Sequence, residues 1–327
     1  MKFPPLYILN DTIRTHLHDL DVLKEAFALV PLPETTAVNL RRMSILKSSL
    51  YSARIEGNPL AISDVTHEIL RNPREVHKRE IGNILRAFTY ADRYRKKQIS
   101  IPYIRALHAI VLHGLSGQAG HFRQEESAIY NTAGIAVYLT PAPADIHRLL
   151  DAWCGWVGDT HDAPPVKAAV SHVWFEKIHP FMDGNGRVGR LLTSSILKRG
   201  GFDFGGIVPF EQYLDEHRQE YYDALMVDRQ DVTGFVEFFL NALVTQARTS
   251  LKEAQNPPAV AQSTLLPRRQ EILNIIRDHR MVSFDFIARR FHGTPARTLH
   301  YDLQQLMKKG LVKKLGTTRG VEYAPGE

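Results

Sequence analysis

The sequence predicts a mainly α-helical protein with one β-hairpin and a C-terminal winged helix-turn-helix domain. Apolar residues recur at steps of three and four through most of the first 254 positions, which is the period of an α-helix. One short segment, SAIYNTAGIAVYLT at 127–140, is instead rich in β-branched and aromatic residues. Residues 267–327 combine three short helical segments with two short strands, and this order is typical of a winged helix.

The N-terminal region is predicted to begin with an irregular lead-in, because prolines punctuate it at Pro4, Pro5, Pro31 and Pro33. A helix follows, and its apolar stripe consists of Leu40, Met43, Leu46, Leu50 and Ala53. The helix is expected to end at 57–59, where Gly-Asn-Pro is a usual stop signal. Residues 1–100 are therefore interpreted as an N-terminal helical segment.

Helical periods continue through the middle of the chain. They cover roughly 77–97, 101–115, 144–157, 164–178, 187–199, 213–227 and 232–254. The hairpin at 127–140 interrupts them and is predicted to turn at 131–134. Residues 101–253 are expected to form the catalytic core, and the uncharged, proline-containing segment 254–266 is expected to be a linker.

The predicted winged helix domain, residues 267–327, has helices at 267–279 and 283–291 and a third helix opened by Thr294-Pro295. On the third helix, one face is apolar and the opposite face is polar. The apolar face carries Leu299, Leu303 and Leu306, and the polar face carries Arg297, His300, Tyr301, Gln304 and Lys308. Two strands are predicted around 316–320. The polar face is what a major-groove reader presents, but many winged helices dock proteins, so DNA and protein partners both stay open.

The distribution of charge also separates this domain from the rest of the chain. The formal net charge is +6, and residues 265–327 contain 12 Lys and Arg against 6 Asp and Glu, so they account for the whole excess. A neutral body with a basic end suggests two tasks, the second of them near a polyanion.

Composition also limits the cellular compartments in which the protein is expected. No apolar run approaches the length of a membrane helix, and the N-terminus lacks the apolar stretch of a secretory signal. Cys154 is the only cysteine, which excludes an internal disulfide and fits a reducing compartment. The sequence therefore predicts a cytoplasmic protein without a membrane partner.

The stretch HPFMDGNGRVGR, residues 179–190, concentrates chemistry-bearing side chains. It contains G-x-G-x-x-G, but the preceding VKAAVSHVWFEKI has a helical period, whereas a dinucleotide-binding loop follows a strand. No Walker A loop occurs in the chain. Gly184, Asn185 and Gly186 can still turn their N–H groups toward an anion at the start of a helix. Arg187 and Arg190, three residues apart, are expected to project into the same space, so the stretch predicts a polyphosphate site.

Two further residues complete this site. Asp183 precedes the cradle, and its carboxylate would repel phosphate unless a cation such as Mg²⁺ lies between them. His179 can direct an imidazole toward the same point, and its ordinary pKa of about 6.5 suits it to remove a proton from a hydroxyl.

The stretch resembles the signature of Fic-domain proteins, H-x-F-x-[DE]-G-N-G-R-x-x-R, at every defining position. The resemblance spans roughly residues 1–250. It implies a Fic-type helical bundle that transfers AMP from ATP to a Ser, Thr or Tyr hydroxyl of a target protein and of itself. It also implies His179 as the general base, Asp183 as the Mg²⁺ ligand and 184–186 as the anion hole. The intact GNGR favours nucleotidyl transfer over the phosphorylation that the relative Doc performs.

The same resemblance assigns the remaining contacts. Arg187 and Arg190 would hold the outer phosphates, and Val188 and Gly189 complete the nucleotide-binding segment. The hairpin 127–140, preceded by GHFR at 120–123, would be a flap on which an extended target segment docks. For the adenine pocket, helical phase does not choose among Tyr213, Tyr221 and Tyr222, and analogy favours Tyr222.

The segment SARIEGN, residues 52–58, places Glu56 at the end of a helix, where the helix dipole disfavours an anion. This segment is similar to the inhibitory motif of Fic proteins, in which the glutamate pairs with the second arginine of the signature. The hypothesis is that Glu56 pairs with Arg190 and occupies the space of the γ-phosphate, so that ATP binds unproductively.

Alternative functions stay open from the sequence. One is transfer of another nucleotide group, such as UMP, on the same scaffold. Another is a DNA-binding regulator that only senses nucleotide, although such a sensor would need no base at His179. Homodimer formation is also left open.

Overall fold

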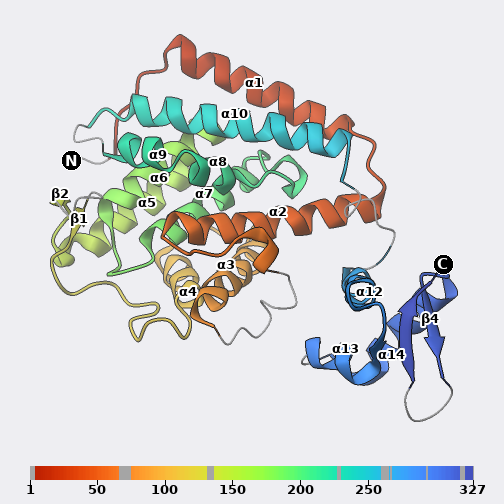
Figure 1. The fold of residues 1–327 in the computed structure, drawn as a ribbon. Coiled ribbons are helices and arrows are strands. Elements are labelled where there is room, and N and C mark those ends of the chain that lie inside the picture. Colours follow the sequence, from red (N-terminus) through yellow and green to blue (C-terminus); the bar gives the residue numbers. More distant parts are fainter. Residues whose placement is uncertain are drawn as a thin grey trace.

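The computed structural model describes residues 4–65, 75–130, 136–226, 230–258, 265, 267–291, 294–316 and 321–326. It is mainly helical, as predicted, and contains two bodies with separate apolar cores (Figure 1). The larger core gathers side chains from the N-terminal region through α10, Thr233–Gln255. The smaller core begins at Leu265 and belongs to a C-terminal domain, residues 265–326.

Two helices at the centre of the larger body position the signature stretch. Helix α6, Pro164–Ile178, is buried along nearly its whole length, as expected for a helix that neighbours cover on every side. It opens with two prolines, which suit the first turn of a helix. Helix α7, Asn185–Arg199, packs against it, and the six residues between the two helices form the loop of the candidate site.

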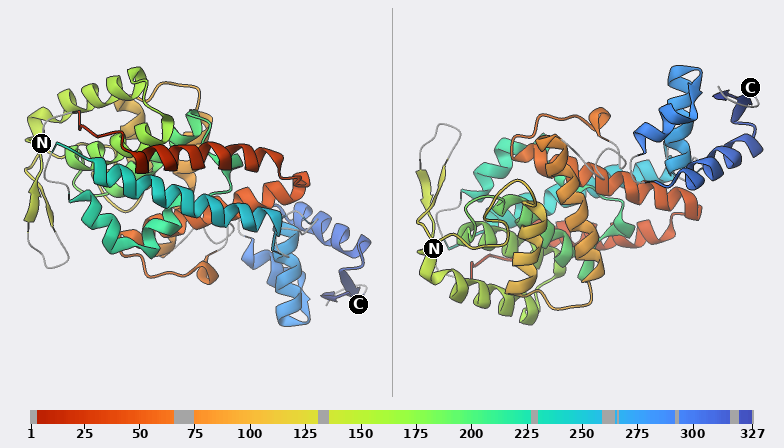
Figure 2. Two further views of the ribbon diagram at one scale, coloured as in Figure 1. Left: turned by 90° about the horizontal axis from the view of Figure 1, so that it is seen from above. Right: turned by 90° about the horizontal axis from the view of Figure 1, so that it is seen from below.

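The prediction of an irregular N-terminal lead-in was wrong, because helix α1, Asp11–Leu29, lies between the two pairs of prolines. The prolines flank the helix and therefore do not break it. Asn10 caps its start, with the side-chain oxygen accepting a hydrogen bond of 3.0 Å from the N–H of Ile13. Helix α1 runs alongside α10 (Figures 1 and 2).

Helix α2, Glu34–Ile55, crosses the larger body and ends near the signature loop, the six residues 179–184 between α6 and α7. It packs on α3, Val76–Arg93, and on α8, Phe210–Glu216. Helices α4, Ile101–Val111, and α5, Ile146–Asp159, continue the bundle, with 3₁₀ turns at Ile62–Asp64, Pro143–Asp145 and Phe204–Gly206. The helix predicted over 213–227 is two helices, because the chain leaves helical geometry at His217 before α9, Arg218–Leu225.

The predicted hairpin consists of β1, Ala128–Tyr130, and β2, Ala136–Leu139, paired antiparallel. The register pairs Ala128 with Leu139 and then shifts between Ile129 and Tyr130. The turn predicted at 131–134 lies outside the described residues. Since this sheet has two strands in the described part of the chain, each strand has one edge that no other described strand pairs with.

The C-terminal domain contains α12, Pro267–His279, α13, Phe284–Arg290, and α14, Ala296–Lys308. Its antiparallel sheet has the order β3-β5-β4, with β3 at Val282–Ser283, β4 at Val312–Leu315 and β5 at Glu322–Pro325. Strand β3 was not predicted. The predicted apolar face of α14 is buried in the core, and its predicted polar face is exposed. Most of the predicted linker and the tip between β4 and β5 lie outside the described residues.

A buried carboxylate stabilises this domain. Asp302 on α14 is 0% exposed, accepts a hydrogen bond of 2.8 Å from Arg269 Nε and is also bound by Arg268. We expect Asp302→Ala to lower the domain's free energy of unfolding by about 3–5 kcal/mol, because it leaves two cations without their anion. Calorimetric unfolding measures the change, and Asp278→Ala at an exposed position of α12 is the control. A loss below about 1 kcal/mol, the scale of surface ion pairs, would contradict this role.

Candidate active site

The loop between α6 and α7 is fixed by its own side chains. Helix α6 ends at Ile178, and the next residue, His179, caps it in a left-handed conformation with φ 47°. Asn185 then holds the loop, because its Oδ1 accepts from the N–H of Phe181 at 2.9 Å and its Nδ2 donates to Phe181 O at 2.8 Å. The Phe181 ring is fully buried, so the loop is anchored in the core.

The start of α7 forms the predicted cradle. Gly184 has φ 81°, a left-handed conformation that favours glycine, and it turns the chain into the helix. The first N–H groups of a helix have no acceptor within the helix, so those of α7 are available to an anion. Gly186 lies close to Glu56, because a Cβ at this position would be 2.4 Å from Glu56 Oε1. The Glu56 carboxylate therefore lies directly against the start of α7.

Helix α4 supports the loop at Asp183 through a histidine that the sequence analysis did not single out. His108 stacks on Phe181 with ring centroids 3.7 Å apart, and its Nδ1 accepts a 2.8 Å bond from the N–H of Gly120. Its Nε2 therefore carries the proton and donates to Asp183 O at 3.0 Å. Burial lowers the pKa of His108 to about 4, so the ring is neutral and keeps this arrangement.

His179 has the tautomer that a general base requires. Its Nδ1 lies 3.2 Å from Glu176 O, and a carbonyl can only accept, so Nδ1 carries the proton and Nε2 keeps its lone pair. Burial lowers the pKa of His179 below its ordinary value, which favours the neutral ring near pH 7.

The two signature arginines are held by different groups. Arg187, whose side chain is 6% exposed, donates from Nη1 to Glu80 Oε1 and from Nη2 to Asp183 Oδ1, both at 2.6 Å. Glu80 in turn accepts a 2.9 Å bond from Asn58 Nδ2. Buried Arg187 Nε has no hydrogen-bond partner among the described residues. Arg187 is therefore tied to the carboxylate proposed for the metal and, through Glu80, to the SARIEGN segment.

Arg190 is held by that segment directly. Its side chain is 1% exposed, and Nη2 donates to Glu56 Oε1 and to Ser52 O, both at 2.8 Å. Its Nε donates to Ser52 Oγ at 3.0 Å. Burial alone would lower the pKa of Arg190, but the nearby Glu56 carboxylate raises it. The guanidinium therefore stays charged and pairs with this carboxylate. Ser52, Glu56 and Asn58 thus each contact the signature arginines directly or through Glu80.

Two of the predicted nucleotide contacts, Val188 and Gly189, are packed within the helices of the larger body. Val188 is fully buried in the core, and its N–H donates to Gly184 O at 3.0 Å as part of α7. Gly189 packs against α6, because a Cβ there would lie 2.2 Å from Glu176 Oε1. Both residues are placed by helix packing. Burial also raises the pKa of Glu176 to about 8, so this carboxyl is largely neutral near pH 7.

Of the three candidate tyrosines, two are buried by packing. Tyr221 is 1% exposed, and its hydroxyl is hydrogen-bonded to His172 Nε2 at 2.7 Å. Tyr213 stacks on His217 with ring centroids 3.9 Å apart. Tyr222 is half-buried and donates to Ile55 O at 2.9 Å, at the end of the helix that leads to Glu56. Burial raises its pKa to about 12, so its hydroxyl stays protonated.

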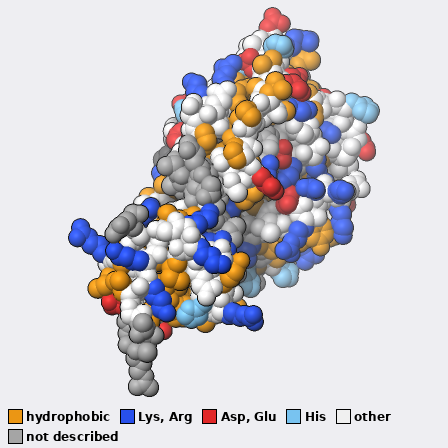
Figure 3. Space-filling view, turned by 90° about the vertical axis from the view of Figure 1, so that its right-hand side faces the viewer, with side chains coloured by type: hydrophobic (Ala, Val, Ile, Leu, Met, Phe, Trp, Pro, Cys, Tyr) orange, Lys and Arg blue, Asp and Glu red, His pale blue; other side chains and the backbone are white. Residues whose placement is uncertain are grey.

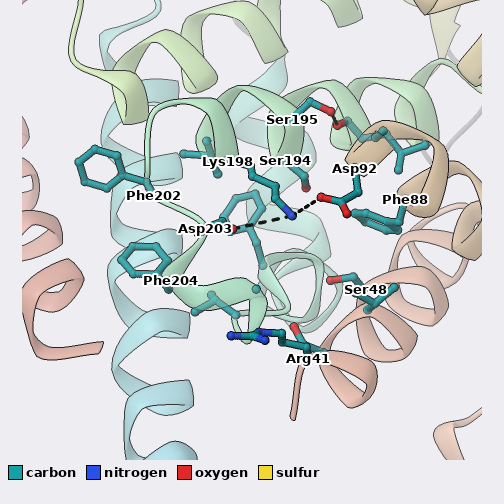
Figure 4. Close-up of a pocket in the computed structure, with 18 of the residues that line it drawn as sticks. Arg41, Ser48, Phe88, Asp92, Ser194, Ser195, Lys198, Phe202, Asp203 and Phe204 are labelled. Carbon is teal, nitrogen blue, oxygen red and sulfur yellow. Dashed lines mark hydrogen bonds and ion pairs between the residues drawn. The ribbon is translucent and has the colours of Figure 1, made fainter. Parts of the chain in front are cut away.

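A cavity of about 560 Å³ lies between α2, α3 and the second half of α7. Lys198 lines this cavity, and its Nζ lies 2.6 Å from Asp92 Oδ1 and 3.9 Å from Asp203 Oδ2 (Figure 4). None of the predicted site residues is among the described residues that line it. The cradle and its arginines are therefore separate from this cavity.

Residues 98–197 match the sequence profile of the Fic/DOC family, and the match ends within α7 after the whole signature stretch. This segment is therefore similar to the Fic/DOC family.

Solved structures extend the likeness of fold beyond this domain. A Fic family protein from Desulfovibrio desulfuricans G20 superposes with a TM-score of 0.69 at 22% identity, over 98% of each chain. Fic-1 from C. elegans superposes with a TM-score of 0.57 at 23% identity, over 75% of this chain and 72% of that one. The mainly helical Fic fold is thereby shown.

Relatives at the sequence level are named protein adenylyltransferase Fic. The one from Drosophila persimilis is 28% identical over 235 residues, which cover 68% of this chain and 44% of that protein. The one from Drosophila melanogaster is also 28% identical, over 68% of this chain and 45% of the relative. This chain therefore spans less than half the length of the relatives that it matches.

Proposed function

We propose that this protein is an adenylyltransferase that moves AMP from ATP to a Ser, Thr or Tyr hydroxyl of a target protein and of itself. The observation that carries the proposal is that His179, whose Nε2 keeps its lone pair, begins the six-residue loop that leads into the first N–H groups of α7. A base next to an anion cradle suits attack of a hydroxyl on a bound phosphate. The names of the relatives support AMP as the transferred group.

The chemical step follows from these residues. The target hydroxyl attacks the α-phosphorus of ATP while His179 Nε2 accepts its proton. The bond from the α-phosphorus to the bridging oxygen breaks, and pyrophosphate leaves with the electron pair. The N–H groups of α7 stabilise the charge that gathers on the phosphate oxygens.

Asp183 fits the proposed role of Mg²⁺ ligand. Its side chain is 64% exposed at the mouth of the cradle, and the described residues contain no cluster of three or more His, Cys, Asp or Glu that would form an all-protein metal site. A single carboxylate with phosphate oxygens and waters is the usual way to bind Mg²⁺. When bound, Mg²⁺ would neutralise phosphate charge in this site.

We further propose that the structure represents the inhibited state. Glu56 Oε1 lies against Gly186 and binds Arg190, which is where the resemblance places the outer phosphates. An anion cannot occupy this position while the carboxylate holds it, because like charges repel. ATP would then bind without the contacts that orient its α-phosphorus.

The reaction class is tested by intact-mass analysis after incubation with ATP and Mg²⁺. A gain that matches one AMP, largest in the Glu56→Gly variant, is the expected result. A parallel incubation with UTP separates the two nucleotides, because a gain of one UMP at equal rate would overturn the preference for ATP. A mass that stays constant with both nucleotides would support a nucleotide sensor instead.

The pH dependence follows from His179. Because burial holds its pKa below the ordinary value of 6.5, the ring is mainly neutral and able to accept a proton at pH 7 and above. We expect kcat/KM for ATP, which reports the free enzyme, to stay constant over this range and to fall only at lower pH. The Glu56→Gly variant suits the measurement, because removing this carboxylate lowers the pKa further. Half-loss of kcat/KM at or above pH 7 would contradict the role.

Partners are proposed from two surfaces. The outer edge of the 127–140 hairpin would pair with an extended target segment, and Tyr222 would contact the adenine. The C-terminal domain, which we interpret as a winged helix, would contact DNA or a partner protein through the exposed face of α14. Figure 3 shows Lys and Arg side chains spread over this domain at lower left. Homodimer formation is also proposed.

The proposed location is the cytoplasm. The free thiol of Cys154 is consistent with a reducing compartment. Among the described helices, none is long and apolar enough to cross a membrane.

A further inference from the structure

One buried arginine joins the flap to the loop of the candidate base. Arg123, at the end of GHFR, is 3% exposed, and its guanidinium donates to backbone carbonyls of three separate segments. Nε donates to His179 O at 2.8 Å, Nη1 donates to Glu125 O at 2.9 Å, and Nη2 donates to Pro141 O. The N–H of Arg123 also donates to Pro180 O at 3.0 Å.

These acceptors belong to two parts of the site, the signature loop and the two ends of the hairpin. His179 and Pro180 belong to the signature loop. Glu125 precedes β1 and Pro141 follows β2, just outside the pair formed by Thr140 N and Ser127 O at 3.1 Å, which closes the hairpin. One side chain therefore fixes both ends of the hairpin against the backbone of the base.

The conformation of His179 needs such support. A left-handed φ of 47° is unfavourable for a residue with a side chain, at about 1–2 kcal/mol, and it persists when the surroundings determine it. The bond from Arg123 Nε to His179 O supplies a constraint at this residue. Lys177 supplies a second link to the hairpin, with Nζ 4.2 Å from the ring centroid of Tyr138 on β2.

We infer that Arg123 is a positioning residue that sets the flap, and with it the target hydroxyl, relative to the base. The inference rests on the proposed function, in which the flap holds the target and His179 accepts the proton. A lysine cannot replace this guanidinium, because one ammonium cannot reach three carbonyls in a planar fork. A displacement of about 1 Å between reacting groups can lower the rate about 100-fold.

The experiment compares Arg123→Lys with Arg105→Lys. Arg105 is the control. Its Nε donates to a backbone carbonyl of the GHFR segment, Gly120 O at 2.8 Å, but it has no hydrogen bond to the signature loop or to the hairpin ends among the described residues. Hydrogen exchange by mass spectrometry follows 124–130, 136–142 and 176–183. In Arg123→Lys we expect exchange in all three to rise together by about 10-fold, and exchange in α7 to stay unchanged. A rise in only one segment, or an equal rise throughout the protein, would overturn the inference.

Transfer is measured in the Glu56→Gly background. Arg123→Lys should lower self-modification by about 10- to 100-fold while the Kd for ATP stays within about twofold. Adding guanidinium ion to an Arg123→Ala variant should restore part of the transfer. An unchanged rate of AMP transfer in Arg123→Lys would contradict the inference. If Glu56→Gly itself shows no AMP gain, the proposed function fails, and the exchange data still judge the coupling by Arg123.

Discussion

The Glu56→Gly variant should modify itself with AMP about 10- to 100-fold faster than the wild type. The change removes the bond from Arg190 Nη2 to Glu56 Oε1 and clears the carboxylate that lies against Gly186. A hydrogen bond between charged groups contributes about 1.5–3 kcal/mol, and each 1.4 kcal/mol corresponds to a factor of ten. Initial rates of AMP incorporation, measured by intact mass at saturating ATP and Mg²⁺, test the prediction.

Two controls separate the charge from the change of backbone. Glu56→Gln keeps the shape of the side chain but loses its charge, so its rate should lie between those of the wild type and Glu56→Gly. Glu216→Gly makes the same substitution at the exposed end of α8, away from the cradle, and should leave the rate unchanged. Equal rates for the wild type and Glu56→Gly would remove the basis for autoinhibition by this residue.

The sequence predicts those parts of the site whose signals are local. The start of α7 follows from glycines that turn the chain and from the helical period on either side, so the cradle could be placed within two residues. The contact between Glu56 and Arg190 joins residues 134 positions apart, and spacing carries no information about it. It was predictable because SARIEGN resembles a known motif.

Residues that act through tertiary packing gave no such signal. Glu80 lies in a charged run on α3, where a solvated side chain is the ordinary expectation, and only packing of α3 on α7 brings it to Arg187. Asp302 similarly sits among polar residues on α14 but faces the core. The missed helix α1 has another cause, since its flanking prolines resemble breakers yet lie outside the helix.

The network around Arg187 changes how the signature is understood. The sequence suggested two arginines that reach the same phosphates, whereas the structure ties Arg187 to Asp183 and Glu80 and ties Arg190 to Glu56. The SARIEGN segment therefore touches both arginines, through Glu56 on one side and through Asn58 and Glu80 on the other. Removing Glu56 alone leaves the second connection intact.

Replacing His179 with alanine should abolish most of the transfer that Glu56→Gly releases. A positioned general base contributes about 10²- to 10⁴-fold, so the Glu56→Gly, His179→Ala double variant should be slower than Glu56→Gly by that factor. The Kd for ATP should change little, because the cradle is formed by the backbone of α7 and the loop is held by Asn185. Intact mass gives the rate, and calorimetric titration gives the Kd.

A histidine outside the site provides the matched control. His113, exposed after α4, can be replaced by alanine in the same background without touching the loop, and the rate should stay within about twofold of Glu56→Gly. If His179→Ala retains more than about a tenth of the rate, proton transfer to this imidazole is not required, because a base worth less than tenfold contributes under 1.4 kcal/mol to the barrier. If the rate and ATP binding fall together, His179 acts through the fold of its left-handed turn instead of through Nε2.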